Sequence, residues 1–316
     1  MEYNQIRVVK PFVEYIKQTD SISHIAKCAR ICYGKESGND ERTVSNLYKA
    51  KHFSMFRHAT VYAIVKYEDY MYDVIKQYKT SPYIKYAVKG EYVYIATNEN
   101  FMIDLEQNYT SCRDIALHKI IRDNQINVED FSNHETGFQL MRYTFIINTS
   151  IATSRELNRV SPNSISERST RYCLANSICE PWWFKINGIN AYDVKLKGDE
   201  IYLKDACSDE WVSEGQVEYK IFNNSTKEDI NIYFKSIISS FNGYNTLINI
   251  GSLKEEARAL LPLATYTKCV YTYSINEWKR IINNRVLDKT GRAHGDAKLI
   301  INKVKSELEE LGYEFS

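Results

Sequence analysis

Residues 154–172, SRELNRVSPNSISERSTRY, concentrate side chains that can bind an anion. The segment holds five serines, one proline and the arginines Arg155, Arg159, Arg168 and Arg171. On a helix, Arg155 and Arg159 would lie four residues apart on one face, where like charges repel each other unless an anion lies between them. Guanidinium groups and hydroxyls both match the oxygens of a phosphate. The segment therefore predicts a phosphate site, and a solvated loop with surface ion pairs is the alternative.

Two later arginines strengthen the prediction of an anionic ligand. Arg258 falls within EEARALLPLA, an apolar segment that predicts a helix, and Arg285 closes WKRIINNR just before an expected turn. Their apolar neighbours predict partial burial of both side chains, and a buried arginine needs an anionic partner. The alternative is that each is a cation on the surface of a helix.

A third group of polar residues stands in KHFSMFRHA. His52, Ser54 and His58 surround two phenylalanines at an expected junction between a helix and a strand. Isolated histidines of this kind usually serve in packing and capping. No second histidine or cysteine stands at helical ligand spacing, and the seven cysteines include no CxxC pair, so we expect no metal site.

These segments resemble the signature of the flavin-dependent thymidylate synthase family, an Arg-His-Arg triplet followed by Ser-x-Arg-Tyr. Ser169, Arg171 and Tyr172 match the second half, and Arg159 matches the first arginine of the triplet, which here reads Arg-Val-Ser. KHFSMFRHATVY is similar to the family's His-x-Ser/Thr-x-Phe-x-His segment. EEARALLPLATYT is similar to its Glu-x-Ala-Arg block, and the same register places Arg285 on the family's late catalytic arginine.

The resemblance implies reductive methylation of dUMP to dTMP, with FAD as cofactor and with NADPH and methylenetetrahydrofolate as co-substrates. It implies a homotetramer, and Arg285 as the catalytic group that stabilises negative charge on the pyrimidine ring. The residues expected to bind dUMP are Glu156, Arg159, Glu167, Arg168, Ser169, Arg171, Arg258 and Arg285. The residues expected to bind FAD are His52, Ser54, Arg159, Ser161, Glu167, Ser274, Asn276 and Arg280.

The altered triplet leaves other functions open. A diverged relative could carry out different C5 chemistry, such as hydroxymethylation, on a pyrimidine nucleotide. A non-catalytic nucleotide-binding subunit is a second alternative. An RNA-binding module is a third, but the formal net charge of +1 disfavours a protein that coats nucleic acid.

Composition places the chain among globular proteins. It has 316 residues, of which 44% are apolar, enough for a sizeable core. The cysteines are odd in number and irregularly spaced, which is typical of reduced thiols. The N-terminal residues have no apolar signal core, and no apolar run is long enough to span a membrane. These features predict a cytoplasmic protein with no membrane or nucleic-acid partner.

The expected elements alternate between helices and strands. Helical spacing is present in residues 21–34, where Gly34 would end the helix, and in residues 40–53, where Asp40 would cap it. The last third of the chain is also expected to be helical, and Ser252 and Glu255 form a capping-box pattern there. RYTFIINT reads as a buried strand, followed by a helix over residues 150–160, and Lys89-Gly90 as the turn of a hairpin. The prediction is an α+β fold with one catalytic domain over residues 1–316 and insertions at about 67–140 and 174–224.

Overall fold

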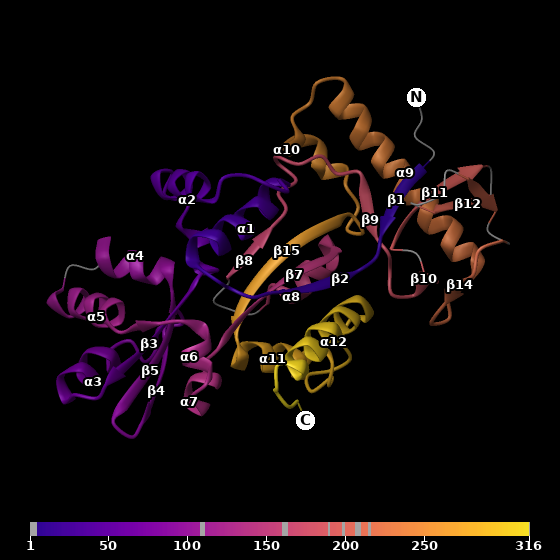
Figure 1. Cartoon of the computed structure of the whole chain (residues 1–316). Coiled ribbons are helices and arrows are strands. Elements are labelled where there is room, and N and C mark those ends of the chain that lie inside the picture. Colours follow the sequence, from indigo (N-terminus) through magenta and orange to yellow (C-terminus); the bar gives the residue numbers. More distant parts are fainter. Residues whose placement is uncertain are drawn as a thin grey trace.

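The computed structural model describes residues 5–107, 111–159, 164–188, 190–197, 200–205, 210–213 and 216–315. It shows an α+β fold, as the sequence predicted, in which a central sheet separates two lobes (Figure 1). The predicted Pro162 loop and the candidate Ser161 lie outside the described residues.

The central sheet has the strand order β2-β7-β15-β8. Its strands are β2 (Phe12–Ile16), β7 (Arg142–Ser150), β8 (Ile165–Glu167) and β15 (Tyr266–Ser274), all paired antiparallel. The buried strand predicted from RYTFIINT is therefore confirmed as β7.

Helices cover both faces of this sheet, because successive side chains of a strand point to opposite faces. Phe145 and Ile147 of β7 pack in one core cluster with α11 (Ile275–Arg285) and α12 (Gly295–Glu310). Ile146, between them, packs with residues of α1 (Ser21–Tyr33) in another cluster. As predicted, Gly34 ends α1, in the left-handed conformation at φ 63°.

The first lobe is built on a sheet of order β4-β5-β3-β6. Its strands are β3 (Thr60–Lys66), β4 (Lys85–Lys89), β5 (Tyr92–Asn98) and β6 (Gln125–Ile126), and its helices are α3 (Asp69–Lys76), α4 (Glu99–Gln107), α5 (Cys112–Asp123), α6 (Val128–Ser132) and α7 (Glu135–Phe138). The hairpin predicted at Lys89-Gly90 joins β4 to β5, with Gly90 at φ 61°.

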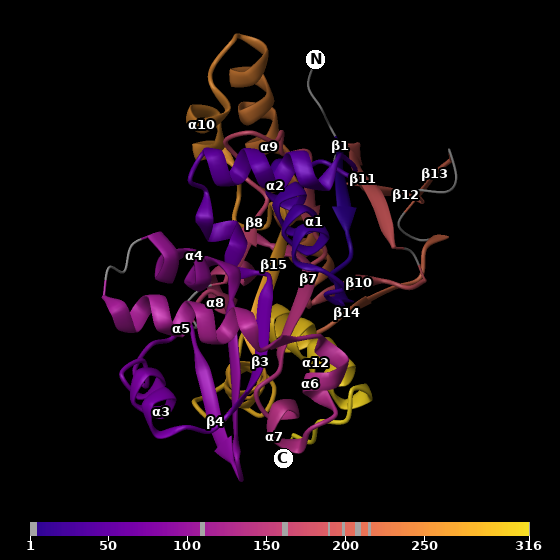
Figure 2. The ribbon, with the colours of Figure 1, turned by 60° about the vertical axis from the view of Figure 1, so that its left-hand side comes forward.

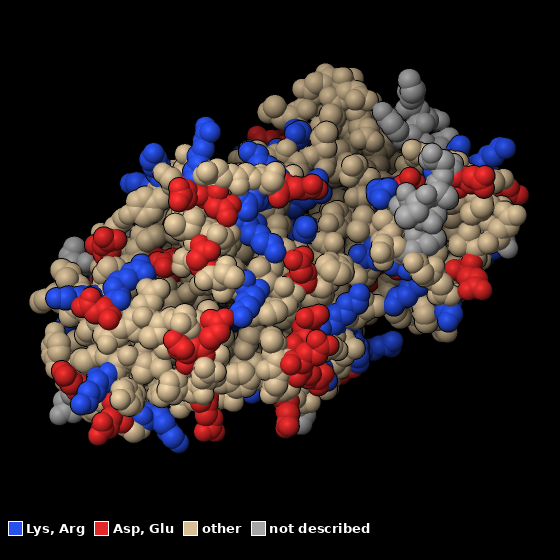
Figure 3. Space-filling view, in the orientation of Figure 1, with Lys and Arg blue, Asp and Glu red and all other residues tan. Residues whose placement is uncertain are grey.

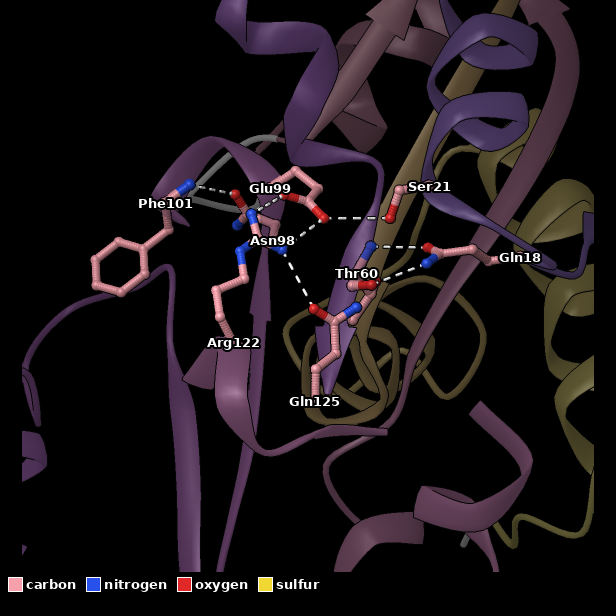
Figure 4. A network of polar contacts seen from close by, with 8 residues as sticks. All are labelled: Gln18, Ser21, Thr60, Asn98, Glu99, Phe101, Arg122 and Gln125. Carbon is pink, nitrogen blue, oxygen red and sulfur yellow. Dashed lines mark hydrogen bonds and ion pairs between the residues drawn. The ribbon is translucent and has the colours of Figure 1, made fainter. Parts of the chain in front are cut away.

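A polar network joins this lobe to the segment that leads into α1 (Figure 4). The side-chain amide of Gln18 donates to the Thr60 carbonyl at 2.8 Å and accepts from the Thr60 N–H at 2.7 Å. Glu99 accepts two bonds from Arg122, at 3.1 and 2.6 Å, and one from Ser21 at 3.3 Å. Gln18 therefore satisfies a strand edge that would otherwise lack a partner.

The second lobe contains a sheet of order β13-β12-β11-β1-β9 and the pair β10-β14. Its strands are β1 (Gln5–Val9), β9 (Ser177–Cys179), β10 (Phe184–Ile186), β11 (Ala191–Lys197), β12 (Glu200–Asp205), β13 (Trp211–Ser213) and β14 (Tyr219–Ile221), and α9 (Lys227–Asn249) packs against them. Figure 2 shows the two lobes on opposite sides of the β7–β15 pair.

Residues 67–140 and 174–224 thus supply most of the two lobes. That they are insertions into a single catalytic domain stays a prediction.

Two predicted caps are wrong by one residue. Asn39, and not Asp40, caps α2 (Asp40–Lys49), while Asp40 pairs with Arg30. At α10 (Lys254–Ala257) the Leu253 N–H donates to the Glu256 carboxylate at 3.1 Å, so Ser252 and Glu255 do not form the predicted capping box. Asn39 and Glu256 can cap a helix as well as Asp40 and Glu255 can, so the sequence alone does not fix the residue at which each helix begins.

Candidate functional site

The helices that leave the two long central strands meet at their C-terminal ends. Ser150, the last residue of β7, caps α8 (Ile151–Leu157), and Ser274, the last residue of β15, caps α11. The two strands are antiparallel, so the helices start at opposite ends of the sheet. Asn158, just after α8, accepts a 2.9 Å hydrogen bond from Tyr271 of β15.

At this meeting point Glu156, Arg159 and Arg285 form what we call the Arg285 cluster. Arg285 Nη2 donates to the Glu156 carbonyl at 3.0 Å and lies 3.3 Å from the Glu156 carboxylate. Arg159 Nη2 lies 2.7 Å from the other carboxylate oxygen. The Arg285 side chain is 18% exposed, whereas that of Arg159 is 66% exposed. The predicted partial burial of Arg285 is confirmed, and the C-terminal end of α11 favours its positive charge.

The loop after β8 and the segment around α10 form a second group, the Arg171 cluster of Ser169, Thr170, Arg171, Glu255 and Arg258. Arg171 Nε lies 3.0 Å from Glu255 Oε2, and Arg258 Nη1 donates to Thr170 Oγ1 at 3.5 Å. Ser169 accepts from the Arg171 N–H at 3.3 Å, and its own N–H donates to the Cys32 carbonyl at 3.0 Å. The backbone of this loop is therefore held to the end of α1.

The predicted burial of Arg258 is wrong. Its side chain is exposed, because α10 ends at Ala257 and the chain continues as a short 3₁₀ turn, Arg258–Leu260. The apolar neighbours that suggested a buried helix, Leu260 and Leu263, are also exposed. The side chains of Arg171 and Arg258 therefore face solvent.

Glu167 and Arg168 lie on the strand and loop that lead to the Arg171 cluster. Glu167 is paired with Cys269 in the central sheet and accepts a 3.1 Å hydrogen bond from Ser154 of α8. Arg168 donates to the Leu174 carbonyl at 3.4 Å. Glu167 is thus the expected site residue that ties α8 to the start of this loop.

The described residues expected to bind FAD lie on several separate elements. His52 and Ser54 are exposed at the start of the 3₁₀ helix η1 (Phe53–Arg57), and Asn276 and Arg280 are exposed on α11. The Ser274 hydroxyl is instead buried and donates to the Glu277 carboxylate at 2.8 Å, as part of the cap of α11. Ser274 therefore has a structural role in this chain.

His58 is fully buried and holds β8 to the centre of the sheet. Its Nε2 lies 2.7 Å from Ser166 Oγ and its Nδ1 lies 2.8 Å from Thr272 Oγ1. Thr272 contacts Thr144 at 2.8 Å, and Thr144 contacts His24 at 3.0 Å. Burial lowers the pKa of His58 to about 3 and that of His24 to about 4, so both rings are neutral. The packing role predicted for His58 is confirmed, whereas His52 and Ser54 are exposed.

Arg142 was not singled out by the sequence, although its guanidinium lies at the junction of the central sheet and the first lobe. It donates to the carbonyls of Arg57 and Thr97 at 3.1 and 3.3 Å and to the Ser164 hydroxyl at 3.2 Å. Burial lowers its pKa, and the nearby Glu277 carboxylate opposes that shift. Its position at the start of a buried strand gave no signal, because these partners come from three segments that are distant along the chain.

In the described part of the chain, six cysteines are free thiols and no group of three histidine, cysteine or acidic side chains could hold a metal ion. None of the helices described there is long and apolar enough to cross a membrane.

Residues 99–311 match the model of the thymidylate synthase complementing protein family. The chain belongs to this family. The family predicted from the arginine–serine segment is therefore confirmed.

Curated members of the family are similar to part of the chain. The flavin-dependent thymidylate synthase of Thermosipho melanesiensis is 28% identical over 153 residues, which are 48% of this chain and 57% of that protein. That of Thermosipho africanus is 26% identical over 153 residues, or 48% and 58% of the two chains. The chain thus spans little more than half the length of these relatives.

Solved structures of the UMP/dUMP methylase PolB from Streptomyces cacaoi are also similar to it. The structure bound with 5-Br UMP has a TM-score of 0.43 at 13% identity and covers 96% of this chain and 92% of that chain. The structure bound with 5-Br dUMP has a TM-score of 0.42 at 14% identity, with coverage of 95% and 90%.

Proposed function

We propose that the chain catalyses the reductive methylation of dUMP to dTMP, with FAD as cofactor and with NADPH and methylenetetrahydrofolate as co-substrates. The observation that carries this proposal is the fixed position of Arg285. A guanidinium that is 18% exposed and held by both the carbonyl and the carboxylate of Glu156 is oriented before a substrate binds. Such preorganised charge is what a reaction through an anionic ring requires.

The C5 atom of uracil is a poor nucleophile until negative charge can build up on the ring. Arg285 would stabilise that charge at N3 and O4, and it would do so without moving a proton, because arginine stays protonated. Glu156 keeps the guanidinium in the orientation that this contact needs. Arg285 therefore acts as an electrostatic catalyst and not as a base.

The Arg171 cluster supplies groups for the phosphate of dUMP. Arg171 and Arg258 are exposed, and Ser169 and Thr170 place hydroxyls beside them. The ion pair between Arg171 and Glu255 is also exposed, and such pairs contribute only about 0–1 kcal/mol. A phosphate dianion that binds both arginines can therefore replace the Glu255 carboxylate.

Each cluster holds two arginines and one carboxylate, Glu156 in one and Glu255 in the other, so each keeps an excess positive charge. We infer that a complete dUMP site joins the Arg285 cluster of one copy to the Arg171 cluster of another. This arrangement agrees with the homotetramer that the family resemblance implies.

The exposed side chains of His52, Ser54, Asn276 and Arg280 fit a phosphorylated cofactor, because they offer donors to solvent. Together with Arg159 they would hold the pyrophosphate of FAD. Bound FAD would supply reducing equivalents.

A cysteine nucleophile is not needed for this reaction. Burial raises the pKa of the Cys28 thiol to about 12, and it raises the pKa values of Cys179 and Cys269 well above their ordinary value, so these thiols stay protonated.

One observation favours a second candidate. The use of Ser274 as a helix cap removes one expected flavin contact, as does the altered triplet. A diverged relative that hydroxymethylates a pyrimidine nucleotide, or a non-catalytic nucleotide-binding subunit, would be consistent with these losses.

The test is the mass of the product formed from dUMP, with NADPH oxidation followed in parallel. We expect a product that carries one additional CH₂ group, formed only when FAD, NADPH and methylenetetrahydrofolate are all present. A gain of CH₂O would establish the hydroxymethylating alternative. Binding of dUMP without NADPH oxidation or product would establish the non-catalytic one.

A nucleotide substrate and free thiols also favour a cytoplasmic location, which native disulfides would contradict.

A further inference from the structure

A cavity of about 1130 Å³ lies between the second lobe and the start of α12. Its walls come from three segments, at Trp182 and Lys185, at Phe222 and Asn223, and along residues 286–303. None of the residues expected to bind dUMP or FAD lines it. The cavity is large enough for a drug-sized or nucleotide-sized ligand.

One wall is the indole of Trp182, which packs directly on the backbone of Gly295. A Cβ atom at Gly295 would lie 2.2 Å from Trp182 Cδ2, so the close approach requires glycine at this position. The backbone N–H of Trp182 donates to the Asp296 carboxylate at 2.6 Å. The contact with Gly295 holds the indole in place, and the side chains of Phe222, Val286 and Leu299 add further apolar lining.

The lining also carries several basic side chains. Lys185, Arg292, Lys298 and Lys303 line the cavity, and Lys and Arg side chains gather in Figure 3 where the body of the molecule meets the second lobe. Burial lowers the pKa of Lys303, and the positive charge of Lys185 lowers it further. A bound anion would relieve this repulsion.

The two acidic side chains of the lining already have partners. Asp288 pairs with Lys298 and accepts from the Ala293 N–H at 3.1 Å. Asp296 accepts from Trp182 and lies 3.8 Å from His294 Nδ1. Lys185 and Arg292 therefore remain as cations that can meet a ligand, and so does Lys303, whose Nζ donates to the Pro11 carbonyl at 2.8 Å and has two further N–H donors. Lys185 Nζ lies 5.7 Å from the centre of the Phe222 ring.

We propose that this cavity binds a nucleoside polyphosphate, at a site separate from that for dUMP. Its base would lie against Trp182, because aromatic side chains stack on any base, and its phosphates would lie among Lys185, Arg292 and Lys303. The combination of an aromatic wall and three cations distinguishes this ligand from a bare polyphosphate, which would gain nothing from the indole. The site goes beyond the proposed function, which assigns no residue of this cavity to dUMP or FAD.

The test is calorimetric titration of the full chain with ATP in the presence of saturating dUMP. We expect ATP to bind, and the double variant Lys185→Ala/Arg292→Ala to bind it about tenfold more weakly or worse, since charge-assisted bonds are lost. Trp182→Ala should weaken ATP binding while leaving the affinity for inorganic tripolyphosphate unchanged, and Trp182→Phe should restore ATP binding. Lys119→Ala, an exposed cation on α5, is the matched control and should behave as the wild type.

Three results would overturn the proposal. The first is no binding of ATP to the wild-type chain at millimolar concentration. The second is an unchanged affinity in the Lys185→Ala/Arg292→Ala variant whose thermal unfolding matches that of the wild type. The third is displacement of ATP by dUMP, which would place both ligands in one site. All three can be read whether or not the chain makes dTMP.

Discussion

Arg285 Nη2 lies 3.0 Å from the carbonyl oxygen of Glu156 and 3.3 Å from its carboxylate. One residue thus holds the guanidinium at two points, although 129 positions separate the two in sequence. Because the helices that carry them converge at their C-terminal ends, the contact depends on the length of both α8 and α11.

Replacing Arg285 with alanine should lower kcat for dTMP formation by about a hundredfold or more, because one preorganised electrostatic contact to the ring anion is lost. Arg285→Lys should recover little of this loss, since an ammonium group cannot make the same planar contacts. The measurement is the initial rate of dTMP formation at saturating dUMP. Glu156→Gln is the control, because it keeps the carbonyl acceptor and should cost less. Wild-type kcat in Arg285→Ala would remove Arg285 from the mechanism.

Arg171→Ala should weaken dUMP binding at least about tenfold, because a charge-assisted bond to phosphate contributes about 1.5–3 kcal/mol. Calorimetric titration with dUMP measures the change. Arg155→Ala is the matched control, since Arg155 is an exposed arginine of α8 in the same segment. Glu255→Gln should bind dUMP as well as the wild type or better, because it removes the carboxylate that competes with the phosphate. Equal affinities in Arg171→Ala and Arg155→Ala would refute the phosphate assignment.

FAD should bind, but more loosely than in relatives with the intact triplet. The purified chain should be partly yellow and should take up added FAD, as followed by flavin absorbance. Arg280→Ala should weaken this uptake about tenfold, while Lys49→Ala, an exposed cation at the end of α2, should not change it. A colourless protein that ignores saturating FAD yet binds dUMP would leave only the alternative functions.

The buried histidines should make the fold sensitive to acid. The pKa of His58 is about 3 and that of His24 about 4 in the folded chain, against an ordinary value of 6.5. Below pH 6.5 the unfolded chain binds protons that the folded chain does not, so the free energy of unfolding falls as pH falls. Each ring should contribute a loss of about 1.4 kcal/mol per pH unit.

Chemical denaturation at pH 6 and pH 5 measures this slope. His58→Gln removes one titrating ring, so its stability should change less steeply with pH than that of the wild type, by about 1.4 kcal/mol per pH unit, from a lower starting value. His52→Gln is the control, because His52 is exposed. An unchanged slope in His58→Gln would show that His58 does not bind a proton on unfolding in this range.

The sequence by itself determined the elements whose patterns are local. The apolar segment RYTFIINT predicted the buried strand β7, the helical period of residues 21–34 with Gly34 as the stop predicted α1, and Lys89-Gly90 predicted the hairpin. It also determined the family, because Ser169, Arg171, Arg258 and Arg285 stand in a recognisable order. Such signals depend only on neighbouring residues along the chain, so they can be recognised without knowledge of the fold.

Tertiary structure alone decided which of these residues meet. Arg258 was expected to be partly buried and is exposed, because the helix that would have buried it stops after four residues. Ser274 was a candidate ligand and is a helix cap, whereas Arg142 carried no signal and yet joins the central sheet to the first lobe. The cavity at Trp182 depends on a glycine more than a hundred residues away. Burial and pairing depend on segments that are distant in sequence, and no local pattern records them.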